Sequence, residues 1–233
     1  MNSKPKVLAF DVFGTVVDWH GSIAAEVLRI DLGVDPNAFA TAWRQGYRPA
    51  MARVRSGELP WTKIDDLHKM ILKNVLNDFQ ITSLSEDQID DLNRVWHRLN
   101  PWPDTVAGLG RMKKQFTLVT LSNGNLGLLA NMAKNAGLPW DLILSAEVFR
   151  HYKPDPETYL GVAQTFDLPA HEVMLVASHK DDLESAHQCG LQTAFIERPF
   201  EFGPNVVRND LHHEDFTNYH AKDFIDLANQ LHC

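Results

Sequence analysis

The sequence has little cysteine. Only Cys189 and Cys233 occur among its 233 residues, and neither belongs to a CxxC motif. Their number and positions argue against a structural metal centre, a dithiol redox pair or a disulfide framework. Two reduced thiols are typical of a cytosolic protein, so we expect the chain to be cytoplasmic.

Positive charge and long apolar runs are also scarce. Acidic residues outnumber basic ones by 30 to 22, which gives a formal net charge of −8. The chain has no block of basic residues, so we expect no nucleic-acid partner. No stretch reaches the roughly 18 apolar residues of a membrane span, so we expect no membrane partner. The apolar run near the N-terminus is too short for a signal peptide.

The chain does contain an alternation of short apolar runs and helix-like stretches. The runs are rich in β-forming residues and lie at 6–13, 116–122, 141–147, 172–178 and 191–197. Helix-like stretches follow the later runs, at 125–136, 156–167, 181–189 and 222–231. Strands that alternate with helices predict a parallel sheet covered by helices on both faces. We therefore expect an α/β fold with a Rossmann-like parallel sheet at its core.

A long segment without strand patterns separates the first run from the second. Its helical patterns lie at 21–33, 36–57, 60–80 and 85–100, several with proline at the start or glycine after the end. We predict that residues 16–100 form a helical cap domain inserted after the first strand. Residues 1–15 and 101–233 would form the α/β core domain. The insertion offers a surface for a homodimer, and the polar stretch 203–220 is expected to be a surface loop.

Polar side chains stand where the predicted strands end. They are Asp11 after the first run, Ser122 and Asn123 after the second, Lys153 after the third, and His179 and Asp182 after the fourth. Ligands of open parallel sheets bind at the carboxyl ends of the strands. We therefore expect these side chains to converge on one edge of the sheet.

This order of residues resembles the four motifs of the haloacid dehalogenase superfamily: a nucleophilic aspartate, a serine or threonine, a lysine and a final acidic motif. The phosphatases of that superfamily carry a second aspartate two residues after the nucleophile, but here Phe13 takes that position and cannot transfer a proton. They also carry an acid four residues before the last one, where this chain has Ser178. Mg²⁺ prefers several oxygen ligands, so we expect no metal and no cofactor, with Asp181 left open as a substitute ligand.

Within the superfamily, the chain looks like the L-2-haloacid dehalogenase subfamily. The matching motifs are Asp-Val-Phe-Gly-Thr at 11–15, Trp-Arg-Gln at 43–45, Ser-Asn-Gly at 122–124, and Lys-Pro at 153–154 with Tyr159 six residues after the lysine. The fourth motif departs from the subfamily pattern, because His179 stands where asparagine is usual. We interpret the chain as a divergent branch of this subfamily.

The resemblance implies hydrolytic dehalogenation of a small-molecule partner, a short 2-halocarboxylate such as haloacetate or 2-halopropionate. The product would be a 2-hydroxy acid, formed through an ester on Asp11. Asp11 would be the nucleophile, Lys153 would keep it ionised, and Asp182 would be the base that activates water. His179 completes the catalytic set, and its role stays open between a partner in proton transfer and a structural hydrogen-bonding residue.

The remaining candidates would bind the substrate or the halide: Thr15, Arg44, Ser122, Asn123, Phe13 and Tyr159. Arg44 and the Asn123 amide would stabilise the departing halide. Ser122 would donate to the substrate carboxylate, and Thr15 would donate to the nucleophile. Phe13 would form part of an apolar wall that excludes water.

Two other functions are compatible with the sequence. One is a Mg²⁺-dependent phosphohydrolase of the same superfamily, against which Phe13 argues. The other is a non-catalytic binding module, since one fold hosts many functions. Asp11, Lys153 and Asp182 argue against it, because binding alone requires no nucleophile.

Overall fold

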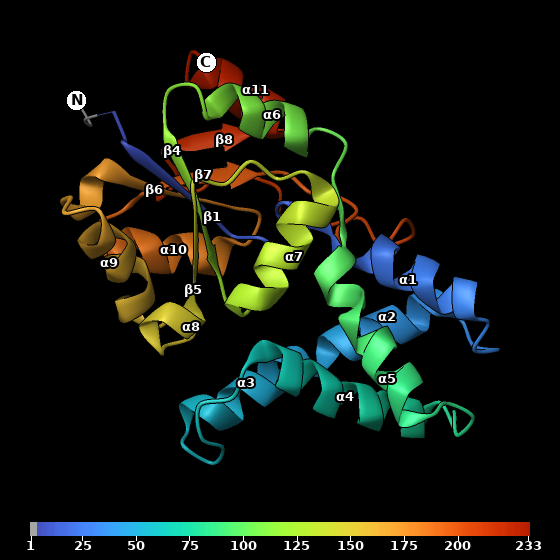
Figure 1. Cartoon of the computed structure of the whole chain (residues 1–233). Coiled ribbons are helices and arrows are strands. Elements are labelled where there is room, and N and C mark those ends of the chain that lie inside the picture. Colours follow the sequence, from blue (N-terminus) through green and yellow to red (C-terminus); the bar gives the residue numbers. More distant parts are fainter. Residues whose placement is uncertain (1–3) are drawn as a thin grey trace.

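The computed structural model describes residues 4–233, in which a parallel sheet lies beside a separate group of helices (Figure 1). The sheet has six strands in the order β5-β4-β1-β6-β7-β8, and all neighbouring strands are parallel. The strands are β1 Val7–Phe10, β4 Thr117–Ser122, β5 Leu142–Ser145, β6 Val173–Ala177, β7 Gln192–Ile196 and β8 Tyr219–Ala221. The predicted α/β fold class is confirmed.

Helices cover both faces of this sheet. Leu8 and Phe10 of β1 belong to one hydrophobic cluster and Val7 and Ala9 to a second, because successive side chains of a strand point to opposite faces. On the side of the first cluster, the sheet is covered by α6 Thr105–Met112, α7 Leu126–Ala136 and α11 Phe224–Gln230, and the cluster continues into the helices between β1 and β4. Two helices contribute to the second: α9 Pro156–Thr165 and α10 Lys180–Gln188. Two short helices complete this part of the chain: α8 Ala146–Phe149 lies between β5 and α9, and η2 Ala170–Glu172 lies between α9 and β6.

Between β1 and β4 the chain forms the separate group of helices (Figure 1). These helices are α1 Trp19–Ile30, α2 Pro36–Gln45, α3 Tyr47–Arg55, α4 Ile64–Asp78, α5 Glu86–Asn93 and the 3₁₀ helix η1 Arg94–Arg98. An antiparallel ribbon of β2 Val17–Asp18 and β3 Asn100–Pro101 joins the two ends of the group. The division into a cap of 16–100 and a core of 1–15 and 101–233 stays a prediction, and its first three residues lie outside the described range.

Two elements differ from the sequence-based expectation. The helix predicted over 36–57 is two helices, α2 and α3, separated at Gly46. Pro49 explains the break, because it has no N–H for the Gln45 carbonyl and its ring crowds that group. The stretch 203–220, predicted to be a loop, runs into the edge strand β8, which pairs with β7. Three residues are too few for a recognisable strand pattern.

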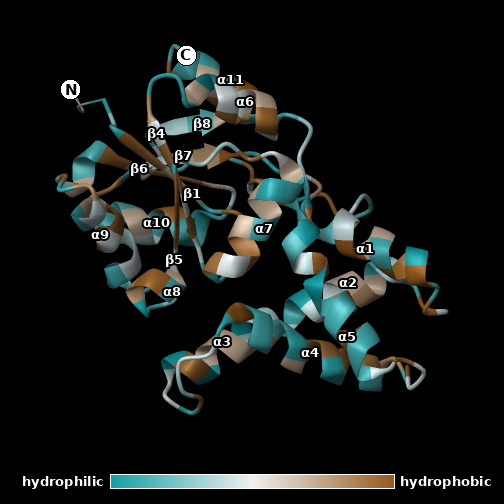
Figure 2. Cartoon of the chain, viewed as in Figure 1, coloured by the Kyte–Doolittle hydropathy of each residue, from teal (hydrophilic) through white to brown (hydrophobic). Residues whose placement is uncertain are grey.

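The distribution of hydropathy follows these layers. Figure 2 shows hydrophobic strands at the centre of the sheet and hydrophilic turns on the outer surfaces of α4 and α5. Strands covered on both faces need no polar alternation, which explains why the strand runs are continuously apolar. Within residues 4–233, no helix combines the length and apolar character needed to cross a membrane.

Candidate active site

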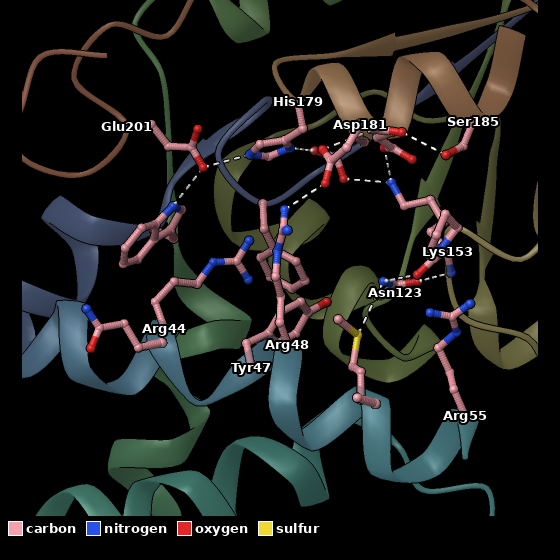
Figure 3. A pocket seen from close by; sticks show the side chains of 18 of the residues that line it. Arg44, Tyr47, Arg48, Arg55, Asn123, Lys153, His179, Asp181, Ser185 and Glu201 are labelled. Atoms are coloured by element: carbon pink, nitrogen blue, oxygen red, sulfur yellow. Dashed lines mark hydrogen bonds and ion pairs between the residues drawn. The ribbon is translucent and has the colours of Figure 1, made fainter. Parts of the chain in front are cut away.

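A cavity of about 760 Å³ lies between helices α2 and α3 and the carboxyl ends of β1, β4 and β6 (Figure 3). A volume in this range is typical of small-molecule sites. The predicted site residues that line it are Asp11, Phe13, Arg44, Asn123, Lys153, Tyr159, His179 and Asp182. Polar groups that follow different strands therefore do meet at one edge of the sheet.

Asp11 follows β1 and is only 7% exposed. Its Oδ1 accepts a hydrogen bond from Lys153 Nζ at 2.9 Å. Its Oδ2 accepts from Thr15 Oγ1 at 2.7 Å and lies 3.1 Å from His179 Nδ1. Burial opposes ionisation, but Lys153 and His179 outweigh it and hold the pKa of Asp11 well below its usual range. The carboxylate is therefore ionised at neutral pH and suited to act as a nucleophile.

Lys153 forms ion pairs with two carboxylates, Asp11 and Asp182, whose pKa values shift in opposite directions. Its Nζ lies 2.9 Å from Asp11 Oδ1 and 2.5 Å from Asp182 Oδ2. Burial disfavours the charged ammonium, but the two carboxylates raise the pKa of Lys153 above its usual value. Asp182 also accepts a hydrogen bond from the Tyr159 hydroxyl at 2.6 Å, and burial raises the pKa of its carboxyl. Asp11 therefore stays an anion, while Asp182 is the carboxylate better suited to accept a proton.

His179 connects Asp11 to a residue that the sequence analysis missed. Its Nδ1 lies 3.1 Å from Asp11 Oδ2 and its Nε2 lies 2.8 Å from Glu201 Oε1 (Figure 3). Burial disfavours the charged ring, but Glu201 and Asp11 raise the pKa of His179 to about 10. The imidazole is therefore a cation at neutral pH, and both ring nitrogens donate.

No local pattern marks Glu201, which lies in the segment after β7. Its side chain has 0% exposure. An indirect signal lies in Gly14, where an added Cβ would stand 2.2 Å from Glu201 Oε1. The φ of Gly14 is also +85°, in the region that favours glycine. Only the fold reveals which group that glycine accommodates.

Arg44 projects from the last turn of α2 into the cavity (Figure 3). Its guanidinium carbon lies 4.4 Å from the ring centre of Tyr47 and 5.5 Å from that of Trp19. Its Nη1 is buried and has no hydrogen-bond partner among the described residues. An unpaired buried donor is costly, so this N–H is available to an anion in the cavity.

Phe13 is 3% exposed and forms an apolar part of the cavity wall. Its ring forms a T-shaped contact with that of Trp96, with 5.6 Å between the centroids. The position that holds an acid in the superfamily's phosphatases is thus part of an aromatic cluster.

Asn123 and Ser122 have different surroundings. Asn123 lines the cavity, and its Oδ1 accepts a hydrogen bond from the Lys153 backbone N–H at 2.8 Å. Ser122 is 1% exposed, and its hydroxyl accepts from the Gly124 N–H at 3.1 Å. Since the structure does not bring Ser122 to the cavity wall, its predicted contact with the substrate carboxylate stays a prediction.

The acidic residues do not fit the magnesium site of the superfamily's phosphatases. Ser178, at the position of the missing acid, donates its hydroxyl to the Ile196 carbonyl at 3.0 Å. An ammonium, that of Lys153, lies between Asp11 and Asp182. Within the described chain, no group of three or more His, Cys, Asp or Glu side chains has an arrangement that could hold a metal ion.

The fold and the site define an α/β protein whose first strand ends in a buried, lysine-paired aspartate that faces a group of helices. The family model of haloacid dehalogenase-like hydrolases matches residues 5–190, so the chain belongs to that family. It is 29% identical to (S)-2-haloacid dehalogenase 1 of Pseudomonas sp. (strain CBS-3), with 83% of this chain and 85% of that protein covered.

Two solved structures are more similar still. The L-2-haloacid dehalogenase PA0810 has 44% identity and a TM-score of 0.92, with 98% of this chain and 100% of that chain covered. The defluorinating L-2-haloacid dehalogenase Rha0230 has 45% identity and a TM-score of 0.93, with 98% and 96% covered. The predicted relationship to L-2-haloacid dehalogenases is confirmed.

Proposed function

We propose that this protein releases halide hydrolytically from short 2-haloalkanoic acids, such as haloacetate or 2-halopropionate, to give 2-hydroxy acids. One observation carries the proposal: an ionised Asp11 shares a cavity with a buried Arg44 N–H that lacks a partner. The first group is a nucleophile and the second a binding site for the halide that it displaces. The similarity to (S)- and L-2-haloacid dehalogenases supports the same reaction.

In the first step, an oxygen of Asp11 forms a bond to the carbon that carries the halogen. The carbon–halogen bond breaks, and its electron pair leaves with the halide. Arg44, together with the Asn123 amide, would donate hydrogen bonds to the negative charge that develops. The step yields an ester on Asp11 and a halide ion.

In the second step, water gives a proton to Asp182 and its oxygen adds to the carboxyl carbon of the ester. The bond between that carbon and the substrate oxygen then breaks, and the alkoxide takes the proton back from Asp182. The regenerated Asp11 carboxyl loses a proton to solvent and is ionised again. Each cycle consumes one water and releases one halide and one proton.

The test is halide release from a panel of 2-haloacids, measured with chloride-, bromide- and fluoride-selective electrodes with and without EDTA. We expect halide release that EDTA does not change. Fluoroacetate belongs in the panel because one similar structure is that of a defluorinating enzyme. Hydrolysis of a phosphate ester that EDTA abolishes, without halide release, would instead identify a phosphohydrolase. Substrate binding without turnover of either kind would identify a binding module.

We also propose a cytoplasmic location, which the two free cysteines support. The net charge of −8 supports small molecules rather than nucleic acid as partners. A homodimer formed through the helical group is a further proposal. Sedimentation velocity would test it, and a species of 26.4 kDa at all concentrations would contradict it.

A further inference from the structure

His179 has a position that suits the second half of the reaction. We infer that it donates a hydrogen bond to the oxyanion formed on Asp11 Oδ2 during ester hydrolysis, and that Glu201 is a positioning residue that holds it there. The inference rests on the proposed aspartyl-ester reaction. It assigns different tasks to the two oxygens of the nucleophile.

The hydrogen bonds distinguish the two oxygens of Asp11. Oδ2 accepts from Thr15 Oγ1 at 2.7 Å and faces His179 Nδ1 at 3.1 Å, so both of its lone pairs are engaged. Oδ1 accepts from Lys153 Nζ at 2.9 Å and from no other donor in the described chain. Each carboxylate oxygen offers two lone pairs in its plane. The pair that is free to attack carbon therefore belongs to Oδ1, and Oδ2 becomes the carbonyl oxygen of the ester.

Negative charge moves to Oδ2 when water adds to this ester. Two donors at hydrogen-bond distance from the atom that becomes negative form an oxyanion hole. Thr15 and His179 already hold these positions in the resting site. They would meet the developing charge without rearrangement, which is the condition under which such donors are most effective.

Glu201 holds the imidazole from its other side. Its Oε1 lies 2.8 Å from His179 Nε2 and accepts from Trp19 Nε1 at 3.3 Å. Its Oε2 accepts from Arg208 Nη1 at 2.8 Å. With 0% exposure and donors on both oxygens, the carboxylate has a single orientation. The ring stands between two carboxylates, so each of its nitrogens must carry a hydrogen.

This arrangement excludes His179 as the general base. A base needs an unprotonated nitrogen, whereas each nitrogen of His179 faces a carboxylate oxygen, which can only accept a hydrogen bond. Esterification removes the charge of Asp11, but that of Glu201 remains and keeps the ring cationic. The charged groups around the ring are Asp11 and Glu201 in direct contact, with Lys153, Arg44 and Arg208 beyond them. His179 thus offers a charged donor where the subfamily has the neutral amide of asparagine.

The variant Glu201→Gln tests the inference. It keeps the size of the side chain but removes its charge, so the pKa of His179 should fall toward its ordinary value. Ester hydrolysis should then slow by up to about 100-fold as pH rises from 6 to 9, because the ring loses its proton. The single-turnover burst of halide should change much less. A rate that instead increases with pH would identify His179 as a base and overturn the inference, as would an unchanged pH profile.

The chain provides a matched control in Glu197→Gln. Glu197 Oε1 lies 2.7 Å from His220 Nε2, and neither residue lines the cavity. Removing this second histidine–glutamate pair should leave the pH profile unchanged. In addition, His179→Asn should retain more ester hydrolysis than His179→Ala, because the amide can still donate to Oδ2. Equal loss in both variants would contradict the role of a donor.

A measurement on the unaltered protein covers the case in which Glu201→Gln fails to fold. Nitrogen-15 NMR of labelled histidines should show both nitrogens of His179 protonated at pH 8, assigned with His179→Asn. A neutral ring at that pH would overturn the inference. This measurement needs no substrate, whereas failure of the proposed function would appear separately, as an absence of halide release from the whole panel.

Discussion

At the scale of single residues, the site separates two aspartates by their hydrogen bonds. Both oxygens of Asp11 face hydrogen-bond donors, and two of these three donors, Lys153 and His179, are cations. Asp182 shares Lys153 and otherwise receives the neutral hydroxyl of Tyr159. Burial affects both carboxyls, but only for Asp11 do nearby cations outweigh it. The surroundings, rather than the residue type, suit one to the proposed role of nucleophile and the other to the proposed role of base.

The first prediction concerns the nucleophile. Asp11→Asn should reduce halide release by about 10⁴-fold or more, because a neutral amide is a poor nucleophile. The side chain keeps its size, so circular dichroism and thermal melting should show a folded protein. Asp78→Asn, a change at an exposed position at the end of α4, should release halide at the normal rate. Normal turnover of Asp11→Asn would contradict the aspartyl-ester mechanism.

The second prediction concerns the halide donor. Arg44→Ala should slow the step that releases halide by about 10²- to 10³-fold, because a preorganised donor to the leaving group is lost. Ester hydrolysis should change much less, since the halide has left by then. Arg44→Lys should recover part of the rate, because it keeps the charge but loses the planar fork. Rapid-quench measurement of halide and hydroxy acid separates the two steps, and an undiminished halide burst in Arg44→Ala would contradict this role.

At the scale of elements, strand order brings the candidate catalytic groups together. β1 lies between β4 and β6, with which it pairs in parallel register. The residues that follow these three strands are therefore neighbours in space, although more than 160 positions separate Asp11 and His179 in the chain. The helices α2 and α3 supply the opposite wall of the cavity.

The third prediction tests helix packing that supports the sheet from one side. A Cβ on Gly108 of α6 would stand 2.4 Å from Phe224 Cβ and 2.7 Å from its backbone carbon in α11. Gly108→Ala should lower the free energy of unfolding by about 1–3 kcal/mol, because backbone cannot move aside as a flexible side chain can.

Gly110 in the same helix is the control for this change. An added Cβ there meets nothing within 4 Å. Gly110→Ala should stabilise the protein by up to about 1 kcal/mol, since alanine is the better helix former. Urea unfolding measures both variants, and equal effects would show that contact with α11 does not govern the packing of α6.

At the scale of the whole molecule, a single hydrophobic cluster joins the sheet to the group of helices. It contains Leu8 and Phe10 of β1 together with Trp43 of α2 and Leu67 of α4. Both walls of the cavity are thereby supported by continuous packing. The polar groups of the site are thus held within a largely apolar interior, where they interact more strongly than at the surface.

The fourth prediction is a pH dependence of stability that originates at His179. Its pKa is about 10 in the folded protein and ordinarily 6.5. Below pH 6.5 the charged ring contributes its full stabilisation of the folded state. This stabilisation is lost as pH rises toward 10, because the folded protein holds the proton of His179 at pH values where the unfolded chain has released it. Between pH 6 and pH 10, the melting temperature of the unaltered protein should therefore fall more steeply than that of His179→Asn. Parallel curves would contradict a charged His179 in the folded site.

The sequence by itself determined the α/β class, the positions of the main strands and the convergence of the catalytic candidates. Continuous apolar runs indicate buried strands, and a polar residue at the end of a run is brought to the sheet edge by parallel topology. Motif order identified Asp11, Lys153 and Asp182 as candidates; Asp11 directly follows β1, Lys153 lies in the segment between α8 and α9, and Asp182 lies in the first turn of α10. Pro49 lies inside a helical pattern, and because it has no N–H the helix expected over 36–57 is divided at Gly46 into α2 and α3.

Only the tertiary structure decided what surrounds these groups. Ser122 satisfies its hydroxyl locally rather than at the cavity wall, and Glu201 reaches His179 from a loop whose sequence carries no recognisable pattern. Such contacts depend on how distant segments fold back on each other, and local periodicity holds no information about that. The electrostatic character of His179 was therefore hidden in the sequence, because a charge on a histidine depends on the carboxylates that the fold places beside it.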